Sequence, residues 1–348
     1  MSIESPAPSQ PGFLKRLVLA GLNILIPLTV GFILAYYVIR ELSQTKLWFI
    51  QALHYVLPWL FIPLVMLLPL AILLRSRIKT LLLILPLPLF LLTYGELYLP
   101  RLPVRTTGDP FVVMTYNVWE GNVQFDQIAS EIQTHDPDLL SIHESSPPLV
   151  QALENRLADS YPYYRIHPGI GFFSRYPILQ SQAFRLGSIY GIPGPWAQHL
   201  VVEIEGEEVN IFNVHPPSPP LQGKYILGLP LRLPTSFRTE GFEIAIQEIL
   251  WRMERVKGPI LVIGDLNFTD QEEEYKFLRR TLEDAHRQCG WGMGFSFARF
   301  PSTGLALWRI DYVLHSDEFV CLRTKSGDFA GSDHRPVIAE LGWRETTD

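Results

Sequence analysis

Eight polar side chains follow or begin short apolar runs of the kind that forms β-strands, and their types suit one chemistry. They are Asn117, Glu144, His215, Asp265, Asn267, Asp311, Asp333 and His334. Carboxylates and amides provide the oxygen ligands that a hard cation such as Mg²⁺ prefers. A histidine beside a carboxylate can stabilise negative charge or carry a proton. Together these groups are what metal-assisted hydrolysis of a phosphoester requires.

The sequence Gly264-Asp265-Leu266-Asn267 is the sharpest of these motifs. Side chains alternate along an extended backbone, so Asp265 and Asn267 would point the same way. There they could orient a water molecule and contact a phosphoryl oxygen, and the glycine would permit a close approach of the backbone. An ordinary Asx-turn after a strand is the alternative interpretation.

A second motif, Ser332-Asp333-His334, precedes a strand-like run near the C-terminus. A tight turn at this point would make His334 available to a phosphate and bring Asp333 near a metal ion. Asp311, which begins another apolar run, supplies a carboxylate that could orient His334 and hold its charge.

Four further residues are weaker candidates when each is taken alone. We interpret Glu144 as the principal cation ligand and Asn117 as its neighbour, although such residues at strand ends are often solvated turn residues. His215 could donate to a substrate oxygen or help to position the leaving group, with a buried structural histidine as the alternative. Arg175 could bind an anionic substrate, because guanidinium groups suit phosphates, or it could bridge two sheets.

From Pro110 onward the apolar residues fall in short clusters, which is typical of an α/β domain. We predict strands at 111–117, 138–142, 209–214, 259–263, 310–314 and 336–341, and helices at 125–134, 241–256 and 271–285. Because the strands repeatedly end in polar residues, the functional groups should gather in one cleft. A proline-rich loop follows His215, and its apolar part, Leu221–Pro234, could either face a lipid bilayer or form a packed lid.

The N-terminal region contains three long apolar segments. Residues 17–39 and 47–74 are long enough to cross a hydrocarbon core of about 30 Å, and the prolines of the second predict a kink. Residues 80–99 form a weaker third segment that could instead lie at the membrane interface. We therefore place a membrane region at 13–100, after a Ser- and Pro-rich stretch at 1–12 that we expect to be disordered. The first segment is too long for a cleaved signal peptide, and no small-residue cleavage site follows it.

The net charge of −6 is unevenly distributed along the chain. The first 100 residues hold seven basic and three acidic residues, which leaves 22 basic and 32 acidic residues for the remainder. The part after residue 100 is therefore at −10 and lacks the basic surface that a duplex-binding nuclease usually has. Nucleic acid is thus not favoured as a partner, whereas the apolar segments predict a lipid bilayer as one.

The side of the membrane depends on the number of crossings. Basic residues near the ends of the segments number five on one side and four on the other, a small bias that favours a cytoplasmic N-terminus. Three crossings would then place the C-terminal domain outside the cytoplasm, and two would place it inside. Cys289 and Cys321 lack the spacing of a zinc site, so they could form a disulfide or remain two buried thiols. An extracytoplasmic location would favour the disulfide.

In residue type and order, the set from Asn117 to His334 resembles the endonuclease/exonuclease/phosphatase superfamily, which includes deoxyribonucleases, apurinic endonucleases, sphingomyelinases and inositol-phosphate phosphatases. The resemblance covers residues 109–342, between a linker at 101–108 and a tail at 343–348. It implies a four-layer α/β (α+β) sandwich of two packed β-sheets flanked by helices. It also implies a Mg²⁺ or Mn²⁺ ion at one end of the sheets.

The resemblance also implies a metal site. Glu144 looks like the metal ligand, Asn117 would support the site, and Asp333 would assist the metal ion or the water. Two positions beyond Asn117, where the apurinic endonucleases carry an aspartate, this chain has Trp119, which puts a second carboxylate ligand in doubt.

The remaining residues would act on the substrate. Asp265 looks like the residue that orients the attacking water, and Asn267 like a phosphate contact. Asp311 would orient His334. A histidine at position 215, where apurinic endonucleases use tyrosine, makes the chain more similar to the deoxyribonuclease and phosphatase branches.

These observations predict a multi-pass membrane protein whose C-terminal domain is a metal-dependent phosphoric ester hydrolase. Its substrate would be a nucleic acid, a lipid headgroup or a small phosphodiester, attacked in line by water. The alternative is a catalytically silent, membrane-anchored binding module with the same fold. Every expected catalytic position is filled, which favours the enzyme.

Overall fold

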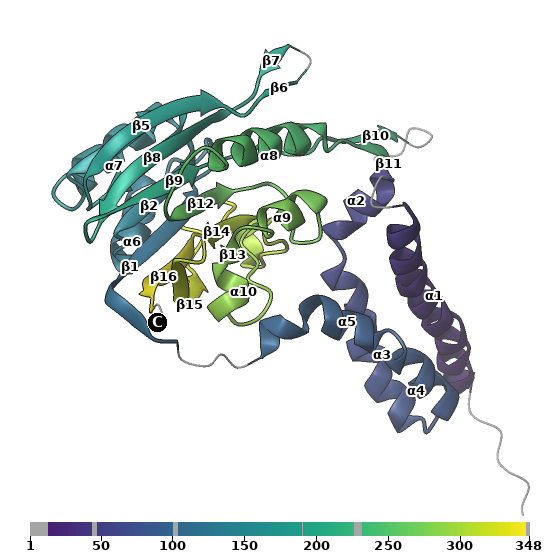
Figure 1. Ribbon diagram of the computed structural model, residues 1–348. Coiled ribbons are helices and arrows are strands. Elements are labelled where there is room, and N and C mark those ends of the chain that lie inside the picture. The colour runs from purple at the N-terminus through teal and green to yellow at the C-terminus, as the bar shows by residue number, and fades with distance from the viewer. Residues whose placement is uncertain (1–12, 44–46, 100–103, 190, 226–231, 346–348) are drawn as a thin grey trace, which may run out of the picture. The chain divides into compact units, whose positions relative to one another are not determined.

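The computed structural model describes residues 13–43, 47–99, 104–189, 191–225 and 232–345. The chain divides into two compact units, Met1–Gly95 and Glu96–Asp348 (Figure 1). The segment expected to be disordered, 1–12, lies outside the described residues.

The N-terminal unit is helical. Its elements are α1 (Phe13–Ser43), α2 (Trp48–His54), the 3₁₀ turn η1 (Pro58–Phe61), α3 (Ile62–Leu73), α4 (Arg77–Ile84) and α5 (Leu87–Tyr94). Two stretches, Arg16–Ser43 and Arg77–Tyr98, are long and apolar enough to cross a membrane, and a third span results if α2 and the helix after it are counted together. That pair is bent by 73°, and its second member begins at Pro58, whose ring is incompatible with a continuous helix. The prolines thus explain the kink.

The C-terminal unit contains two six-stranded sheets. The first has the order β15-β16-β1-β2-β4-β3 and the second the order β13-β14-β12-β9-β8-β5. The strands of the first sheet are β1 (Thr106–Asn117), β2 (Leu139–Ser145), β3 (Tyr163–His167), β4 (Gly169–Ser174), β15 (Phe319–Ser326) and β16 (Val337–Arg344). Those of the second are β5 (Ile178–Arg185), β8 (Trp196–Ile204), β9 (Glu207–Asn213), β12 (Ile260–Asp265), β13 (Glu283–Asp284) and β14 (Asp311–His315).

Helices cover the outer faces of both sheets (Figure 1). They are α6 (Phe125–His135), α7 (Pro147–Leu157), α8 (Glu240–Met253) and α9 (Glu273–Leu278), whereas α10 (Ala285–Cys289) packs against strands of both sheets. One apolar cluster, with Val113 and Ile211, fills the space between the sheets. A second packs α8 and α9 on the outside of one sheet, and a third packs α6 and α7 on the outside of the other. The unit is therefore the four-layer sandwich that the sequence predicts.

The register of the strands brings polar residues to one end of this sandwich. On β1, Phe111 and Val113 point into the space between the sheets, and Asn117 occupies the same face four residues after Val113. Four other strands likewise carry polar residues at this end of their inward-facing positions. The inward polar residues are Ser141 and His143 on β2, Asn213 on β9, Asp265 on β12 and Asp311 on β14.

Strand direction explains why these residues meet. β1 and β2 are parallel, as are β9 and β12, so the four strands end at the same edge. β14 runs antiparallel to β12 and begins there, with Asp311 directly opposite Asp265.

The predicted helix at 271–285 is wrong in its second half. The helix ends at Leu278, and Glu283 and Asp284 pair with β14. Asp284 accepts hydrogen bonds from the backbone N–H groups of His286 and Arg287 and from the Arg309 guanidinium. Its carboxylate therefore starts a new helix and binds a distant residue, and neither role is visible in a local helical pattern.

Two boundaries and the proline-rich loop also differ from what the sequence predicts. Strand β1 begins at Thr106, so the end of the expected linker belongs to the first sheet, and β16 continues into the expected tail as far as Arg344. The proline-rich loop forms a hairpin of β10 (Leu221–Tyr225) and β11 (Arg232–Phe237), with residues 226–231 outside the described part. A second short hairpin joins β6 (Ser188–Ile189) to β7 (Ile192–Pro193).

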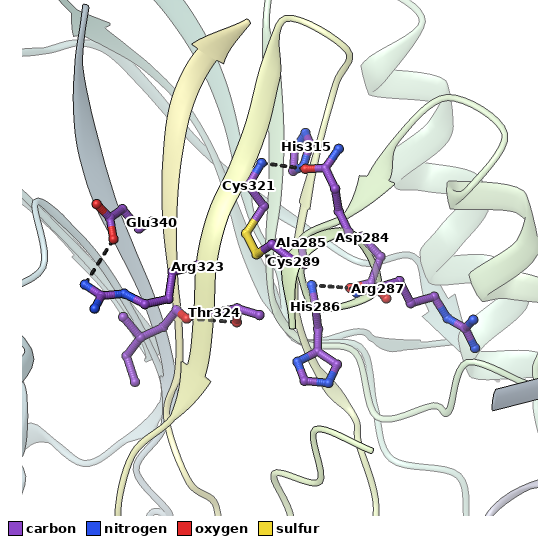
Figure 2. Close-up of a disulfide and its surroundings, with 12 residues drawn as sticks. Asp284, Ala285, His286, Arg287, Cys289, His315, Cys321, Arg323, Thr324 and Glu340 are labelled. Atoms are coloured by element: carbon purple, nitrogen blue, oxygen red, sulfur yellow. Dashed lines mark hydrogen bonds and ion pairs between the residues drawn. A yellow bond between two sulfur atoms is a disulfide. The ribbon is translucent and has the colours of Figure 1, made fainter. Parts of the chain in front are cut away.

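A disulfide joins Cys289 at the end of α10 to Cys321 on β15 (Figure 2). The Cα atoms of the two residues are 5.6 Å apart, which is the ordinary separation for a disulfide. Of the two alternatives for these cysteines, the structure has the disulfide. The bond ties a helix on the second sheet to a strand of the first.

We predict that Glu274→Gln stabilises the C-terminal unit at pH 8 and has little effect at pH 5. Burial, and then repulsion from Glu272 and Glu243, raises the pKa of Glu274 to about 7. Because this pKa lies above that of an unfolded glutamate, stability is highest in acid and falls as the pH rises towards 7 and the carboxyl ionises. Removing that charge should add about 1–3 kcal/mol to the free energy of unfolding at pH 8.

Calorimetric unfolding of the full chain in detergent at both pH values measures this difference. The exposed Glu318→Gln serves as the matched control. Equal effects of Glu274→Gln at the two pH values would contradict the assignment.

Candidate active site

The outer part of the site is a carboxylate held between an amide and an imidazole. The Oε1 atom of Glu144 accepts a hydrogen bond of 2.9 Å from Asn117 Nδ2 and lies 3.3 Å from His215 Nε2. The side chain of Glu144 is 36% exposed and that of His215 is 17% exposed, whereas that of Asp265 is only 1% exposed. Glu144 and His215 thus face the opening, and Asp265 lies deeper.

Asp265 is at the centre of the site and contacts groups from several strands. Its Oδ2 atom accepts a hydrogen bond of 3.0 Å from Asn117 Nδ2, and lies 3.6 Å from His215 Nδ1 and 3.7 Å from His334 Nε2. Its Oδ1 atom accepts the backbone N–H of Asn267 at 2.9 Å. The same carboxylate therefore touches both imidazoles of the site.

The innermost part is the pair of Asp311 and His334. The Oδ2 atom of Asp311 lies 2.8 Å from His334 Nδ1, which directs Nε2 of the same ring towards Asp265. The hydroxyl of Ser332 donates to the carbonyl of Asn117 and accepts the backbone N–H of His334, so the C-terminal turn is fixed to the end of β1.

Unusual backbone conformations position two of these side chains. Glu144 has φ of 54° and Asn267 has φ of 57°, in the left-handed region that few non-glycine residues adopt. Glu144 also lies in a bulge, where the pairing of β2 with β4 skips from His143 to Ser145. Gly264 has φ of 155°, and a Cβ atom there would be 1.8 Å from the carbonyl oxygen of Val214, so only glycine permits this approach.

The charges of the site are strongly coupled. Burial favours the neutral form of Glu144, but hydrogen bonds from His215 and Asn117 outweigh it and lower its pKa to about 2. Burial and the charge of Asp311 raise the pKa of Asp265 to about 6. Burial favours neutral His334, yet Asp311 and Asp265 raise its pKa to about 10, and Glu144 and Asp265 similarly raise the pKa of His215. At neutral pH, Glu144 and Asp265 are therefore ionised and His334 is protonated.

Three residues were predicted for the metal site: Glu144, Asn117 and Asp333. Of these, Glu144 belongs to a cluster of atoms that could bind a metal ion. Glu144, His215 and Asp265 offer atoms within 4.8 Å of one another, and so do Asp265, Asp311 and His334. Asn117 directs its amide nitrogen at the two carboxylates, and its oxygen accepts the backbone N–H of Trp119. The amide of Asn117 thus holds the carboxylates of Glu144 and Asp265 in place.

Asp333 and Asn267 lie at the margin of the site. Asp333 belongs to neither of the two clusters, although its charge raises the pKa of His334. Asn267 completes an Asx-turn with Asp265, and its side chain donates to the carbonyl of Pro216 and approaches His215 Nδ1 at 3.5 Å. Asn267 therefore takes part in the Asx-turn and also lies beside the site.

Arg175 is remote from these residues. It follows β4, and its backbone N–H donates to the carbonyl of Asp138 at the beginning of β2, whereas Glu144 is at the end of that strand. Its guanidinium pairs with Asp136 and Asp138 and lies over the ring of Tyr161. The predicted contact of Arg175 with substrate is not supported, because two local carboxylates hold its charge.

The structure contains a buried hydrogen-bond network beside His215 that the sequence did not predict. Ser141 Oγ and His143 Nε2 both bond to Asn213 Oδ1, at 2.6 and 2.8 Å. Asn213 Nδ2 donates to Gln198 Oε1 and to the carbonyl of Gly171, which links the two sheets. Burial, and then the neighbouring His215, lowers the pKa of His143 to about 3, so the His143 ring is neutral at physiological pH. The inward register of these polar residues was the signal that could have identified them.

A second buried network fixes the start of β14. Arg309 pairs with Asp284 at 2.6 Å and with Asp270 at 3.0 Å, and Asp270 also pairs with Arg287. Arg287 contacts Glu96 as well. Since Arg309 is two residues before Asp311, this network stabilises the strand end that carries the carboxylate partner of His334.

Comparison with known families agrees with this geometry. A model of the endonuclease/exonuclease/phosphatase family matches residues 114–334, which span every site residue from Asn117 to His334. The chain belongs to this family. Members of the family are hydrolases that act on phosphoesters. No curated protein matches the chain.

Solved structures of family members share the fold at low sequence identity. A family member from Bacteroides vulgatus is 19% identical, with a TM-score of 0.53, and the alignment covers 68% of this chain and 100% of that one. A member from Beutenbergia cavernae is 18% identical, with a TM-score of 0.54 and coverage of 69% and 72%. A mannosyl-6-phosphatase from Bacteroides thetaiotaomicron is 19% identical, with a TM-score of 0.52 and coverage of 67% and 100%. These likenesses establish the sandwich fold.

We predict that Asp311→Asn lowers the pKa of His334 from about 10 into the neutral range, because the largest favourable charge beside the ring is lost. Histidine NMR resonances of the full chain in detergent would show this change. In the unsubstituted protein the His334 resonance should not titrate between pH 6 and 8.5, whereas in the variant it should. The exposed Asp317→Asn is the control, and a His334 pKa that is unchanged in Asp311→Asn would refute the pairing.

Proposed function

We propose that the protein is a membrane-anchored phosphoesterase that uses Mg²⁺ or Mn²⁺ to hydrolyse a phosphoester by direct attack of water. The observation that carries this proposal is the convergence of Glu144, His215 and Asp265 with the Asp311–His334 pair at one end of the sandwich. Each residue comes from a different strand or turn. Such a convergence serves no evident packing purpose, because it costs the burial of several charges.

The residues fit a hard divalent cation. Glu144 and Asp265 offer carboxylate oxygens in one cluster, and no thiol belongs to it. Glu144 and Asp265 are both ionised at neutral pH, so a cation between them would balance negative charge. These two residues would hold the ion, which when bound would polarise a phosphoryl oxygen and neutralise its charge.

The remaining residues position the reactants and hold protons. Asp265 is ionised above about pH 6, where it can accept a hydrogen bond from the attacking water and take its proton. His334 stays protonated, with Asp311 at Nδ1, so that Nε2 can donate to a phosphoryl oxygen. His215 can donate in the same way from the opposite side of Asp265, while Asn117 keeps the two carboxylates in place.

Charge and the comparisons favour a small or lipid-bound phosphoester over nucleic acid. The part of the chain after residue 100 carries −10 and lacks a general basic surface. One structure with the same fold is a mannosyl-6-phosphatase, which shows that the sandwich supports hydrolysis of a small phosphate ester. A bilayer through the N-terminal helices would be the second partner, which supports a substrate at or near a membrane surface.

We place the catalytic domain outside the cytoplasm. The N-terminal unit has up to three spans, and an odd number of crossings with a cytoplasmic N-terminus gives this topology. The disulfide between Cys289 and Cys321 supports it, because disulfides persist in oxidising compartments.

Activity should depend on the metal ion and on the central residues. We expect the full chain in detergent to hydrolyse phosphoesters with Mg²⁺ or Mn²⁺, to stop with EDTA, and to lose activity as the pH falls below about 6 and Asp265 becomes protonated. Asp265→Asn and His334→Ala should each lower kcat by at least about 10²-fold, as loss of a preorganised transition-state contact does.

Steady-state rates on a panel of phosphate monoesters, phosphodiesters and plasmid DNA provide the measurement, with the exposed Asp317→Asn as the control. Metal binding without turnover on any substrate would favour a silent binding module.

Topology can be tested in a bacterial host. A C-terminal alkaline phosphatase fusion should be active and a C-terminal green fluorescent protein fusion dark. A membrane-impermeant maleimide should label Cys289 and Cys321 only after reduction. Fluorescent cells, together with cysteines that the impermeant maleimide labels without reduction but only after the membrane is permeabilised, would place the domain in the cytoplasm.

A further inference from the structure

A cavity of about 840 Å³ opens beside the catalytic residues, and it shares Glu144 and His215 with them. Its other walls come from the beginning of α7, the turn between β3 and β4, and the adjacent ends of β5 and β8. The volume is in the range of pockets that hold small organic ligands. Since the phosphate must lie at Glu144 and His215, the group esterified to it can extend into this cavity.

We infer that this cavity binds the alcohol part of the substrate, and that this alcohol is rich in hydroxyl groups, as in a sugar or cyclitol phosphate. The inference rests on the proposed function, because it takes the phosphate to lie at the catalytic residues. The residues that select the alcohol are Arg185, Trp196, Glu154, Gln151 and Glu120.

Arg185 is a positioned cation in the wall of the cavity. Its guanidinium carbon lies 3.8 Å from the centre of the Trp196 ring, and its Nη1 donates to the carbonyl of Gly194 at 3.0 Å. His167 lies by the same indole, with ring centres 5.7 Å apart. Within the described part of the chain no carboxylate pairs with Arg185. Stacking thus fixes the guanidinium while several of its N–H donors stay available to a ligand.

Acceptors line the same cavity. Glu154 and Gln151 project from α7, and Glu120 lies in the loop after β1. Among the residues that the structure describes, none of these three side chains makes a hydrogen bond or an ion pair. The cavity therefore offers two carboxylates and an amide without partners among the described residues, and a guanidinium that uses only Nη1 for a hydrogen bond within the protein.

This mixture matches hydroxyl groups better than a second anion. A hydroxyl both donates and accepts, so neighbouring hydroxyls can bond to Glu154 and Arg185 at the same time. A second phosphate would meet Arg185 but would be repelled by Glu120 and Glu154. A nucleic-acid strand would need a series of basic residues along its path, and Arg185 is the one Lys or Arg among the described lining residues. The face of Trp196 is taken by Arg185, which leaves it unsuited to base stacking.

The decisive experiment compares substrates in full-length variants in detergent. Myo-inositol 1-phosphate and glucose 6-phosphate supply the hydroxyls, and phosphatidylinositol vesicles present the same chemistry from a lipid. Bis(p-nitrophenyl) phosphate and plasmid DNA lack a hydroxyl-rich alcohol. We expect Arg185→Ala and Glu154→Gln each to lower kcat/KM at least tenfold for the soluble or the lipid polyol phosphate, and less than twofold for bis(p-nitrophenyl) phosphate. Arg165→Ala and Glu203→Gln, both exposed and outside the cavity, are the controls.

Binding separates this inference from the proposed activity. Calorimetric titration of the His334→Ala protein with myo-inositol 1-phosphate and glucose 6-phosphate, with Mg²⁺ present, should show binding that Arg185→Ala weakens at least tenfold. If no substrate turns over but this binding is seen, the proposed hydrolysis fails and the cavity assignment stands. Equal losses on all substrates in Arg185→Ala, preferred cleavage of DNA, or turnover without any polyol-phosphate binding or preference would each overturn the assignment.

Discussion

Three acidic side chains and two imidazoles lie within one small volume between two β-sheets, and their mutual contacts are the constraint on which the catalytic end depends. Asp265 is nearly fully buried, and it is tolerable there only because Asn117, His215 and His334 surround it. The same contacts hold Glu144 ionised and His334 protonated. Removing one member would therefore disturb the charge state of the others as well as its own contact.

The sandwich positions these groups through its strand register. Apolar side chains occupy most inward positions of the strands, and polar side chains occupy inward positions at one end. The site is therefore built on the same strands as the hydrophobic core. Two buried networks support this end from behind, one through Asn213 and one through Arg309. Both link segments far apart in the sequence, which makes the geometry a property of the folded unit.

The sequence predicted most of this because strand alternation is local. The spacing of Asp265 and Asn267 and the places of Glu144 and His334 beside apolar runs made them candidates, and the family resemblance added the order of the whole set along the chain. Local patterns could not predict which distant side chain each charged residue pairs with. Arg175 was expected to face a phosphate, yet Asp136 and Asp138 hold it, and Asp284 left the expected helix because it binds Arg309. Arg185 carried no signal, since its function depends on Trp196 and on walls from three other elements.

The bulge at Glu144 has a consequence for how such a protein can change over evolutionary time. Glu144 has no partner in the pairing of β2 with β4. The sheet therefore does not depend on this residue for its strand pairing. The carboxylate most exposed to solvent in the site is thus also the one least tied to the core. A lineage could exchange it and lose chemistry in a single step while retaining a folded sandwich, its cavity and its apolar N-terminal helices. Within this fold, catalysis can thus be lost while substrate binding is retained.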